Sequence, residues 1–351
     1  MNICITGFGW SGSGALFDML REYDDVQIID CNGHDFEFYL LSDPDGIRTL
    51  DYHLNYVHNR INSYRAINRF LKLTKAFSKA KFLHYDVVFK GHFMDLTDKY
   101  VDSLIDFSLK SSTYYEVLFP SFKLRLIRSV NMLFFRVFRK LSNITGLHYN
   151  PFPFQIGLKE MLCSYNPECF MQKTHQYLDS LLTIIDDKSG NPMIFDQIFP
   201  PDSPQDYMKY LPQSKCIVVR RDPRDTYLLA KCTYNSLIPL PTDTVENFVT
   251  FYKKVIIDSQ IPDSNEILSI WFEDLIFKYE ETRIKVEAFL GISLHTRPLS
   301  LFDPSVSINN TNLSERYSHY KSDIEYIEKM LPEALYPFER YPYIRTSDKV
   351  F

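Results

Sequence analysis

The chain has 351 residues, 45% of them apolar, and a formal net charge of −5 at pH 7. This length and apolar share suffice for a full hydrophobic core and predict one elaborated domain over residues 1–351. The acidic balance, without a recognition motif, argues against nucleic acid as a partner. The six cysteines lack metal-ligand spacing, and the chain begins on an apolar segment with no run of eighteen apolar residues after it. We therefore expect a cytoplasmic protein with free thiols and no signal peptide.

The first thirty residues predict a strand, a turn of small residues and a helix. The segment Ile3-Cys4-Ile5-Thr6 is apolar and β-branched, and an amphipathic pattern follows the turn. Helix N-termini bind anions through free N–H groups and the helix dipole, and glycines let the backbone approach a phosphate. The turn therefore predicts an anion site, formed by Gly9, Trp10, Ser11, Gly12, Ser13, Gly14 and Ala15.

The same turn is also compatible with a dinucleotide site. Gly7, Gly9 and Gly12 spell G-x-G-x-x-G, and Asp30 follows a second predicted strand over 26–29, as in NAD-type oxidoreductases. Two features favour a compact phosphate group instead. The run of small residues continues beyond Gly12, and no regular alternation of strands and helices follows Asp30. An ATPase P-loop is disfavoured because no Gly-Lys-Ser/Thr follows the turn.

The basic residues of the chain are strongly segregated. Residues 52–85 and 117–159 hold fourteen of the 39 bases and none of the 44 acids. Basic side chains that cover a helix surface explain the first stretch. Within the second, residues 122–141 interleave apolar side chains with bases, which is typical of a helix lying on an anionic membrane surface. Peripheral membrane contact, a lipid-linked acceptor and an ordinary core helix are the alternatives for this segment.

The middle of the chain is predicted to be mainly helical. The pattern predicts a helix over 53–83, a short strand over 86–90 and mostly helix over 99–185. We expect a large helical insertion over about 50–190 within the domain, and we expect it to hold the acceptor.

Strands and helices alternate in the rest of the chain. Glu273 and Asp274 are predicted to cap a helix that follows one of these strands. Strands are predicted at 193–196, at 216–220 and from Ile267, helices near 244–257, 280–290 and 322–331, and a loop at 303–314. The alternation predicts an α/β fold with a mainly parallel central sheet that helices cover on both faces.

Four segments, in this order, carry a family resemblance. Residues 10–14 stand where the sulfotransferase family has Lys/Arg-Ser-Gly-Thr-Thr, and 193–200 look like a degenerate strand end with its acid. The strand 216–220 ends in Arg221-Asp222-Pro223-Arg224-Asp225, similar to the family's Arg-x-Pro-Arg-Asp. Residues 270–292 resemble its Tyr-Glu-Asp-Leu and Phe-Leu-Gly segments. The chain thus resembles enzymes that use 3′-phosphoadenosine-5′-phosphosulfate on a P-loop-like α/β fold.

The resemblance implies a role for each end of the donor. The loop over 9–15 would wrap the 5′-phosphosulfate, and Arg221 would grip the 3′-phosphate. Three residues depart from the family pattern: Trp10 replaces the loop cation, Leu229 replaces a serine on the 3′-phosphate, and Gln197 replaces a lysine. The candidate bases that substitute for them are Lys90, Lys173 and Lys231.

Sulfuryl transfer also needs a base for the acceptor hydroxyl. Asp196 ends a predicted strand on the edge where such sheets bind ligands, although a turn or cap role is an alternative. Lys173-Thr174-His175 matches the Lys-Thr-His of cytosolic sulfotransferases, whose histidine is the base, although a solvated helix face is the alternative. His92 is a third candidate. This chemistry needs no metal.

The sequence therefore predicts a sulfotransferase that acts on a hydroxyl of a saccharide or glycolipid. The catalytic candidates are Asp196, His175 and Lys173. One alternative is an NAD-type oxidoreductase, and another is a nucleotide-binding or membrane-docking module without catalysis.

Overall fold

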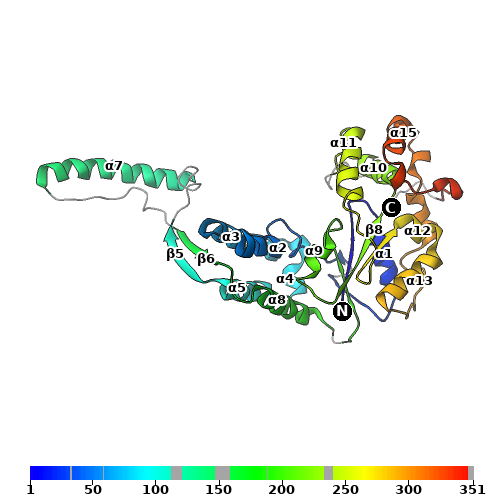
Figure 1. Ribbon diagram of the computed structural model, residues 1–351, viewed down its shortest axis with the longest axis horizontal. Helices are drawn as coiled ribbons and strands as arrows, with labels where there is room; N and C mark the ends of the chain where they lie inside the picture. Colours follow the sequence, from blue (N-terminus) through cyan, green and yellow to red (C-terminus); the bar gives the residue numbers. More distant parts are fainter. Residues whose placement is uncertain are drawn as a thin grey trace.

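The fold is built on a five-stranded sheet whose neighbouring strands all run parallel (Figure 1). The computed structural model describes residues 1–31, 34–57, 59–111, 121–146, 159–187, 189–232 and 240–346. In order across the sheet, the strands are β2 (Gln27–Ile28), β7 (Met193–Asp196), β1 (Asn2–Gly7), β8 (Ser214–Arg220) and β9 (Ile267–Trp271). The predicted α/β fold with a mainly parallel sheet is confirmed.

Both faces of the sheet are buried. Within β8, Cys216 and Val218 join the core on one face, whereas Ile217 and Val219 join the core on the other. This double burial explains why the strand is apolar without interruption. The second face is covered by α1 (Ser13–Leu20), α12 (Phe272–Phe277) and α13 (Tyr279–Leu290).

Between β2 and β7 the chain forms an arm, residues 30–185, that extends to one side of the sheet (Figure 1). Its elements are β3 (Asp30–Cys31), β4 (His34–Asp35), α2 (Ile47–Asp51), the π-helix η1 (Tyr52–Tyr56), α3 (Arg60–Lys79), η2 (Lys81–Leu83), α4 (Tyr85–Val88), α5 (Phe93–Leu104), β5 (Phe107–Ser111), α7 (Phe122–Thr145), β6 (Lys159–Cys163) and α8 (Phe170–Ile185). Aromatic side chains fill the core between the arm and the sheet, among them Phe36, Phe38, Tyr85 and Phe89.

Two parts of the arm differ from the prediction. Residues 86–90 were expected as a strand, but they begin inside the helix α4. A short apolar run does not distinguish a strand from a buried helix. The stretch 99–185 is helical only in part, because it contains the antiparallel pair β5 and β6, in which Phe107 lies opposite Cys163. This pair of strands packs against α3 through Tyr64.

Helix α7 stands apart from the rest of the arm (Figure 1). It has 24 residues, and none of its side chains is buried. Among the helices that the structure describes, none has both the length and the apolar character needed to span a bilayer.

The segment after β7 forms a second helical group beyond the carboxyl edge of the sheet (Figure 1). Its elements are α10 (Pro223–Cys232), α11 (Val245–Phe251), the π-helix η3 (Tyr252–Ile257), α14 (Pro304–Ser307), η4 (Ile308–Asn310), η5 (Leu313–Glu315), η6 (Ser318–Tyr320), α15 (Lys321–Met330), η7 (Pro332–Ala334) and η8 (Phe338–Arg340). The short helix α9 (Pro204–Met208), which also follows β7, instead packs on the core of the arm through Tyr207. The expected loop at 303–314 thus contains short helices. Helices α10, α11 and α15 share one apolar core.

Candidate functional site

The carboxyl ends of β7, β1 and β8 bring three predicted site segments to one edge of the sheet. Strand β1 lies between the other two, with Ile5 opposite Asp196 and Gly7 opposite Val219. The loop that leaves β1 therefore starts between Asp196 on one side and Arg221 on the other. Parallel α/β sheets bind their ligands at this edge.

Two glycines shape the loop between β1 and α1. A Cβ on Gly7 would clash with the side chain of Ser11 and would lie 3.0 Å from the carbonyl oxygen of Val219. Gly12 has a φ of +82°, and a Cβ there would clash with the ring of Phe272. Only glycine fits at both positions, so the small residues fix the path of the loop as well as exposing its backbone.

The loop offers unused polar groups to a ligand. No side chain caps α1, and in its first turn the N–H of Ala15 donates to the carbonyl oxygen of Gly12 over 3.1 Å. Ser11 is 4% exposed, and its Oγ has no hydrogen-bond partner among the described residues. Ser11 borders a narrow pocket, which Phe8, Gly9, Arg220, Arg221, Thr226, Tyr252 and Ile256 also line. The pocket is much smaller than the clefts that hold drug-sized ligands.

Arg221 contacts the loop from the end of β8. Its Nη1 donates a hydrogen bond to the carbonyl oxygen of Trp10 over 3.2 Å, and its Nη2 donates to the carbonyl oxygen of Asn310. The guanidinium carbon lies 4.4 Å from the centre of the Phe272 ring. The residue is 2% exposed, and burial lowers its pKa. Arg221 thus braces two backbone segments, while its Nε has no partner among the residues that the structure describes.

Two departures from the family pattern are packing residues in this structure. Trp10 packs against the apolar core of α10, α11 and α15, where the family has a cation. Leu229, at the position of the family's serine, is fully buried in the same core. An apolar contact therefore anchors the loop at the position where the family has a charged side chain.

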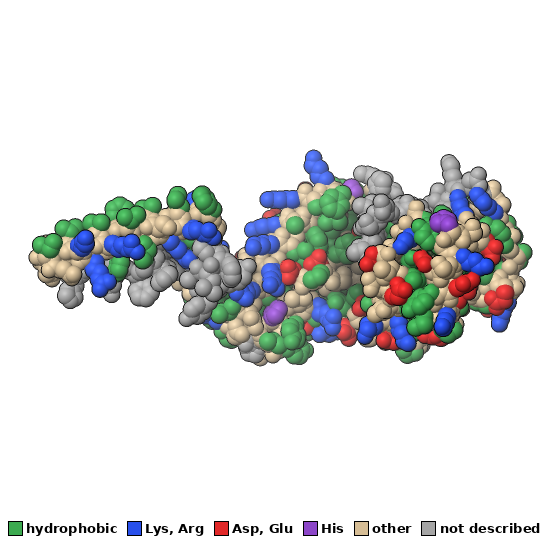
Figure 2. Space-filling model, turned by 90° about the horizontal axis from the view of Figure 1, so that it is seen from above, with side chains coloured by type: hydrophobic (Ala, Val, Ile, Leu, Met, Phe, Trp, Pro, Cys, Tyr) green, Lys and Arg blue, Asp and Glu red, His purple; other side chains and the backbone are tan. Residues whose placement is uncertain are grey.

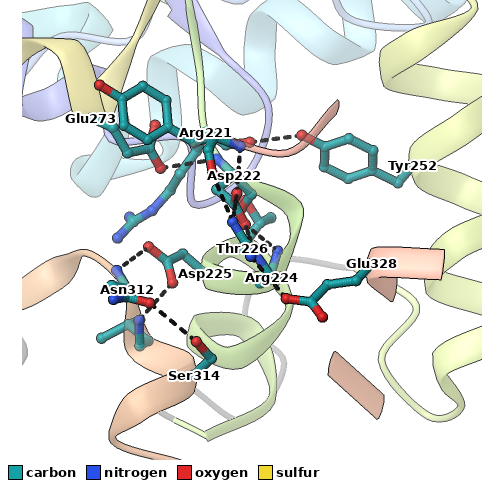
Figure 3. A network of polar contacts seen from close by, with 12 residues as sticks. Arg221, Asp222, Arg224, Asp225, Thr226, Tyr252, Glu273, Asn312, Ser314 and Glu328 are labelled. Carbon is teal, nitrogen blue, oxygen red and sulfur yellow. Dashed lines mark hydrogen bonds and ion pairs between the residues drawn. The ribbon is translucent and has the colours of Figure 1, made fainter. Parts of the chain in front are cut away.

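The residues after β8 form a polar network that fixes the end of the chain (Figure 3). Asp222 accepts hydrogen bonds from Nε and Nη2 of Arg224 over 3.0 and 2.8 Å, and from the N–H of Tyr336 over 2.7 Å. Arg224 also donates to Glu328 on α15 over 2.9 Å. Paired, doubly hydrogen-bonded charges of this kind hold their geometry well. The network ties the C-terminal segment to the edge of the sheet.

Two buried carboxyl groups beside this network have raised pKa values. Burial, with the nearby charge of Asp222, raises the pKa of Glu273 to about 8 and that of Asp225 to about 7. The charge of Arg221 opposes both shifts. Asp225 accepts the backbone N–H groups of residues 312–313, and Glu273 accepts that of Asp222 over 3.0 Å.

The prediction that Glu273 and Asp274 cap a helix is wrong. They lie in the first turn of α12, but no side chain caps this helix. Glu273 points toward the end of β8, and Asp274 accepts a hydrogen bond from the hydroxyl of Tyr336 over 2.9 Å. Both carboxylates therefore hold neighbouring segments rather than the N-terminus of α12.

Arg220, the last residue of β8, is a pocket residue that the motif did not reveal. Its Nη2 donates to Ser269 Oγ over 3.3 Å, and burial lowers its pKa. Side chains alternate along a strand, so Arg220 and Arg221 leave β8 toward opposite faces. Both line the pocket. The signal that would have found Arg220 is the pair of adjacent cations at the end of one buried strand.

Asp196 lies at the same edge, at the end of β7. Its carbonyl oxygen accepts the N–H of Phe38 over 3.2 Å. Burial raises the pKa of Tyr39, and the charges of Glu37 and Asp196 raise it further. The neighbouring Gln197 accepts a hydrogen bond from the hydroxyl of Thr6, at the end of β1, over 2.9 Å. Asp196 is thus the predicted base that the structure places beside the strand carrying the loop.

The other two predicted catalytic residues lie in the arm. Lys173 donates from Nζ to the carbonyl oxygen of Ser103 over 2.8 Å. His175 donates from Nε2 to the carbonyl oxygen of Lys209 over 2.9 Å. These contacts place both side chains of α8 against α5 and the end of α9. Within the part of the chain that the structure describes, they are not brought together with the loop.

The remaining basic candidates are also engaged elsewhere. Lys90 donates to the carbonyl oxygen of Ile184 over 2.7 Å, in the arm. Lys231 lies in the last turn of α10 and donates to the carbonyl oxygen of Thr242 over 2.5 Å. His92 precedes α5. The two cations that line the pocket are therefore the arginines that follow one another at the end of β8.

The order of strands argues against the dinucleotide alternative. In the dinucleotide-binding fold the second strand lies next to the first, so its acidic residue reaches the ribose. Here β7 separates β2 from β1. Asp30 forms an ion pair with Arg21 over 3.4 Å. A dinucleotide site requires the acid to follow the strand next to β1. Here the strand before Asp30 is separated from β1 by one strand.

Comparisons with known proteins give little further information. No family model matches the chain, and no curated protein matches it. Among solved structures, the chain is similar to the sulfotransferase STF9 from Mycobacterium avium, with a TM-score of 0.32 and 10% sequence identity. The similarity covers 98% of this chain and 77% of the other. A likeness this weak carries no argument, so the functional conclusion depends on the residues and geometry described above.

Proposed function

We propose that this chain is a sulfotransferase that uses 3′-phosphoadenosine-5′-phosphosulfate. In this proposal the loop over residues 9–15 binds the 5′-phosphosulfate through backbone N–H groups and the Ser11 hydroxyl. The end of β8 binds the 3′-phosphate, with Arg221 fixing the loop and Arg220 facing the pocket.

One observation carries the proposal: the two motif segments meet. The carbonyl oxygen of Trp10 and Nη1 of Arg221 are 3.2 Å apart, although 211 positions separate the residues. Ser11, Arg220 and Arg221 line one pocket. A small-residue loop at a helix N-terminus, next to cations from a neighbouring strand, suits a ligand with two anionic groups.

The topology supports a P-loop-like arrangement. Counted along the chain from first to fifth, the strands of the parallel sheet lie in the order 2-3-1-4-5. The anion-binding loop joins the first strand to the first helix, and the strand that ends in Arg220 lies directly beside it. This order leaves the loop and the cations as neighbours.

The transfer itself is a single displacement. The acceptor hydroxyl oxygen attacks sulfur, the bond between sulfur and the bridging oxygen of the 5′-phosphate breaks, and Asp196 takes the hydroxyl proton. The products are a sulfate ester and adenosine 3′,5′-bisphosphate. Negative charge develops on the bridging oxygen, where first-turn N–H groups of α1 and the Ser11 hydroxyl stabilise it. Trp10 supplies no charge there, so in this proposal the N–H groups and the Ser11 hydroxyl stabilise the bridging oxygen, and the side-chain cations Arg220 and Arg221 lie at the 3′-phosphate end.

The proposed acceptor is a hydroxyl of a saccharide or glycolipid. Support comes from the arm, where the π-helix η1 exposes Tyr52 and Tyr56 at 52% and 68%. Their rings are stacked with centres 6.4 Å apart. The Lys209 ammonium lies 6.0 Å from the Tyr56 ring centre, which adds a charged group beside a flat apolar surface.

Ligand-induced thermal stabilisation tests the donor assignment. Wild-type protein is heated with adenosine 3′,5′-bisphosphate, ATP or NAD⁺, and the shift in Tm is measured. The proposal requires stabilisation by the bisphosphate and a smaller shift with Ser11→Ala, whereas Ser305→Ala, at an exposed serine in the first turn of α14, keeps the wild-type shift. Stabilisation by NAD⁺ alone would point to an oxidoreductase. No response to any nucleotide would leave a module without this catalysis.

A further inference from the structure

We propose that α7 docks this protein onto an anionic lipid bilayer, lying in the interface with its apolar face among the acyl chains. The argument uses the helix alone and stands independently of the proposed enzymatic function.

The first observation is an exposed apolar face. Ten apolar side chains of α7 are at least 39% exposed and fall within an arc of about 160°, at about 100° per residue. They are Phe122, Leu126, Ile127, Val130, Leu133, Phe134, Val137, Phe138, Leu141 and Ile144. A helix in a soluble domain buries such a face against the core. Here, among the residues that the structure describes, these side chains stay at least 39% exposed from Phe122 to Ile144, and a patch of this kind marks an interaction surface.

The second observation is the charge on the rest of the helix. Six bases and no acids occur between Phe122 and Thr145. Four of them, Arg125, Arg128, Arg136 and Arg139, lie on the arc opposite the apolar face. Lys140 lies at the edge of that face, and Lys123 lies within it, in the first turn of the helix. Figure 2 shows apolar side chains along one edge of the helix and Lys and Arg side chains along the other. This pattern is complementary to a surface that is apolar beneath and negatively charged on top.

The distribution of the bases selects the orientation. Arg128, Arg136 and Arg139 lie well inside the helix, so a membrane-spanning orientation would carry them into the hydrocarbon, which is costly. With the axis in the membrane plane, the four arginines stay among the headgroups while the opposite face inserts. The long side chains of Lys123 and Lys140 extend from the apolar face to the headgroups.

The placement of the helix allows this contact. Helix α7 has 24 residues and is therefore about 36 Å long. It stands beyond the β5–β6 hairpin at the far end of the arm (Figure 1), away from the sheet edge that carries the loop. Binding of α7 to a bilayer would thus leave the pocket beside Ser11 accessible.

Vesicle sedimentation with the full chain tests the proposal. We expect binding to vesicles of about 30% phosphatidylserine in phosphatidylcholine and at least tenfold weaker binding to phosphatidylcholine alone, with a decrease as salt is raised. Leu133→Glu combined with Val137→Glu should lower the partition coefficient at least tenfold, because both residues lie on the apolar face about midway along the helix and are exposed. In the variant Phe134→Trp, brominated acyl chains should quench the fluorescence of the introduced tryptophan.

A matched control separates insertion from simple charge attraction. Ser129→Glu combined with Asn143→Glu changes the net charge by the same amount on the opposite arc of α7. We expect this variant to retain binding within about threefold. Equal losses in both variants, or no quenching of the tryptophan, would overturn insertion. A different outcome would show that this face binds a second copy of the chain instead. In that case the wild-type protein does not bind vesicles and forms an oligomer, and Leu133→Glu combined with Val137→Glu dissociates the oligomer.

Discussion

The guanidinium of Arg221 and the carbonyl oxygen of Trp10 are hydrogen-bonded over 3.2 Å, so the end of β8 holds the loop that follows β1. The same guanidinium donates to the carbonyl oxygen of Asn310 and lies on the ring of Phe272. The buried side chain of Arg221 thus joins the loop after β1, helix α12 and the segment around Asn310. Any change at Arg221 should affect all three.

Arg221→Ala should strongly destabilise the fold. Removal of one partner from a buried charged group typically costs about 3–5 kcal/mol. Here Asp222, Asp225 and Glu273 lose their neutralising neighbour. Urea denaturation measures the free energy of unfolding, and Arg221→Lys, which retains the charge, should lose less. A decrease below about 1 kcal/mol for Arg221→Ala would show that the guanidinium does not hold these segments.

Ser11→Ala should separate binding from stability. The Ser11 hydroxyl is buried without a partner among the described residues, so its removal should leave the free energy of unfolding unchanged or raise it by about 1 kcal/mol. The affinity for adenosine 3′,5′-bisphosphate should decrease about tenfold, since one hydrogen bond to the ligand is lost. Calorimetric titration gives the affinity. Reduced stability with unchanged affinity would assign the hydroxyl a structural role.

Gly12→Ala and Gly14→Ala should have different effects. At Gly12 the φ of +82° and the clash with Phe272 together predict a loss of about 2–4 kcal/mol. At Gly14 a Cβ meets nothing within 4 Å, so alanine should be neutral or gain up to about 1 kcal/mol from helix propensity. Thermal and urea unfolding of both variants checks this. Similar losses at the two positions would contradict the described path of the loop.

The stability of the protein should decrease as pH rises from about 5 to 8. The pKa of Glu273 is about 8 in the folded chain against an ordinary value of 4.5, so in this range the folded chain holds a proton that the unfolded chain has released. That stabilisation is complete below the unfolded pKa and is lost as pH rises through the folded pKa. The slope is at most about 1.4 kcal/mol per pH unit for this group.

Glu273→Gln is the variant that tests this assignment. The amide oxygen can still accept the N–H of Asp222, and no charge remains to be buried. The variant should be more stable than wild type at about pH 8.5 and should show a shallower slope between pH 7 and 8. Glu281→Gln, at an exposed position of α13, is the control and should leave the profile unchanged. An identical slope for Glu273→Gln and wild type would contradict the raised pKa.

Asp196→Asn and His175→Ala compare the two proposed bases. Loss of a general base lowers the rate by about 10²–10⁴-fold, and Asp196 is the candidate at the sheet edge beside the loop. Asp196→Asn should therefore reduce sulfuryl transfer to that extent with unchanged affinity for the bisphosphate. His175→Ala, whose imidazole bonds to Lys209 in the arm, should change the rate less than about threefold. The reverse ranking would move the chemistry to α8.

The strands were predictable where their pattern is local. The apolar β-branched runs at 2–7, 214–220 and 267–271 are strands because both faces of the sheet are buried, which requires apolar residues throughout. The run at 86–90 is equally apolar but too short to distinguish strand from helix, and it begins within α4. The β5–β6 pair was missed because its strands are joined by a long connection and not by a recognisable turn.

The site was predictable to the level of its segments. The loop and the motif after β8 were found because each has a local pattern of small or charged residues. The contact of Phe272 with Gly12, and the approach of Glu273 to Asp222, depend on β9 pairing with β8, which no local pattern specifies. Likewise, two adjacent arginines do not reveal that both line one pocket until the neighbours of their strand are known.

Relative affinity for adenosine 3′,5′-bisphosphate and adenosine 5′-monophosphate tests the central claim most directly. The two ligands differ only in the 3′-phosphate, and calorimetric titration of the wild-type protein gives both dissociation constants. Because a charge-assisted contact to the second phosphate contributes about 1.5–3 kcal/mol, the bisphosphate should bind at least tenfold more tightly. Equal affinities, or no binding of either nucleotide, would contradict a site formed jointly by the loop after β1 and the arginines at the end of β8.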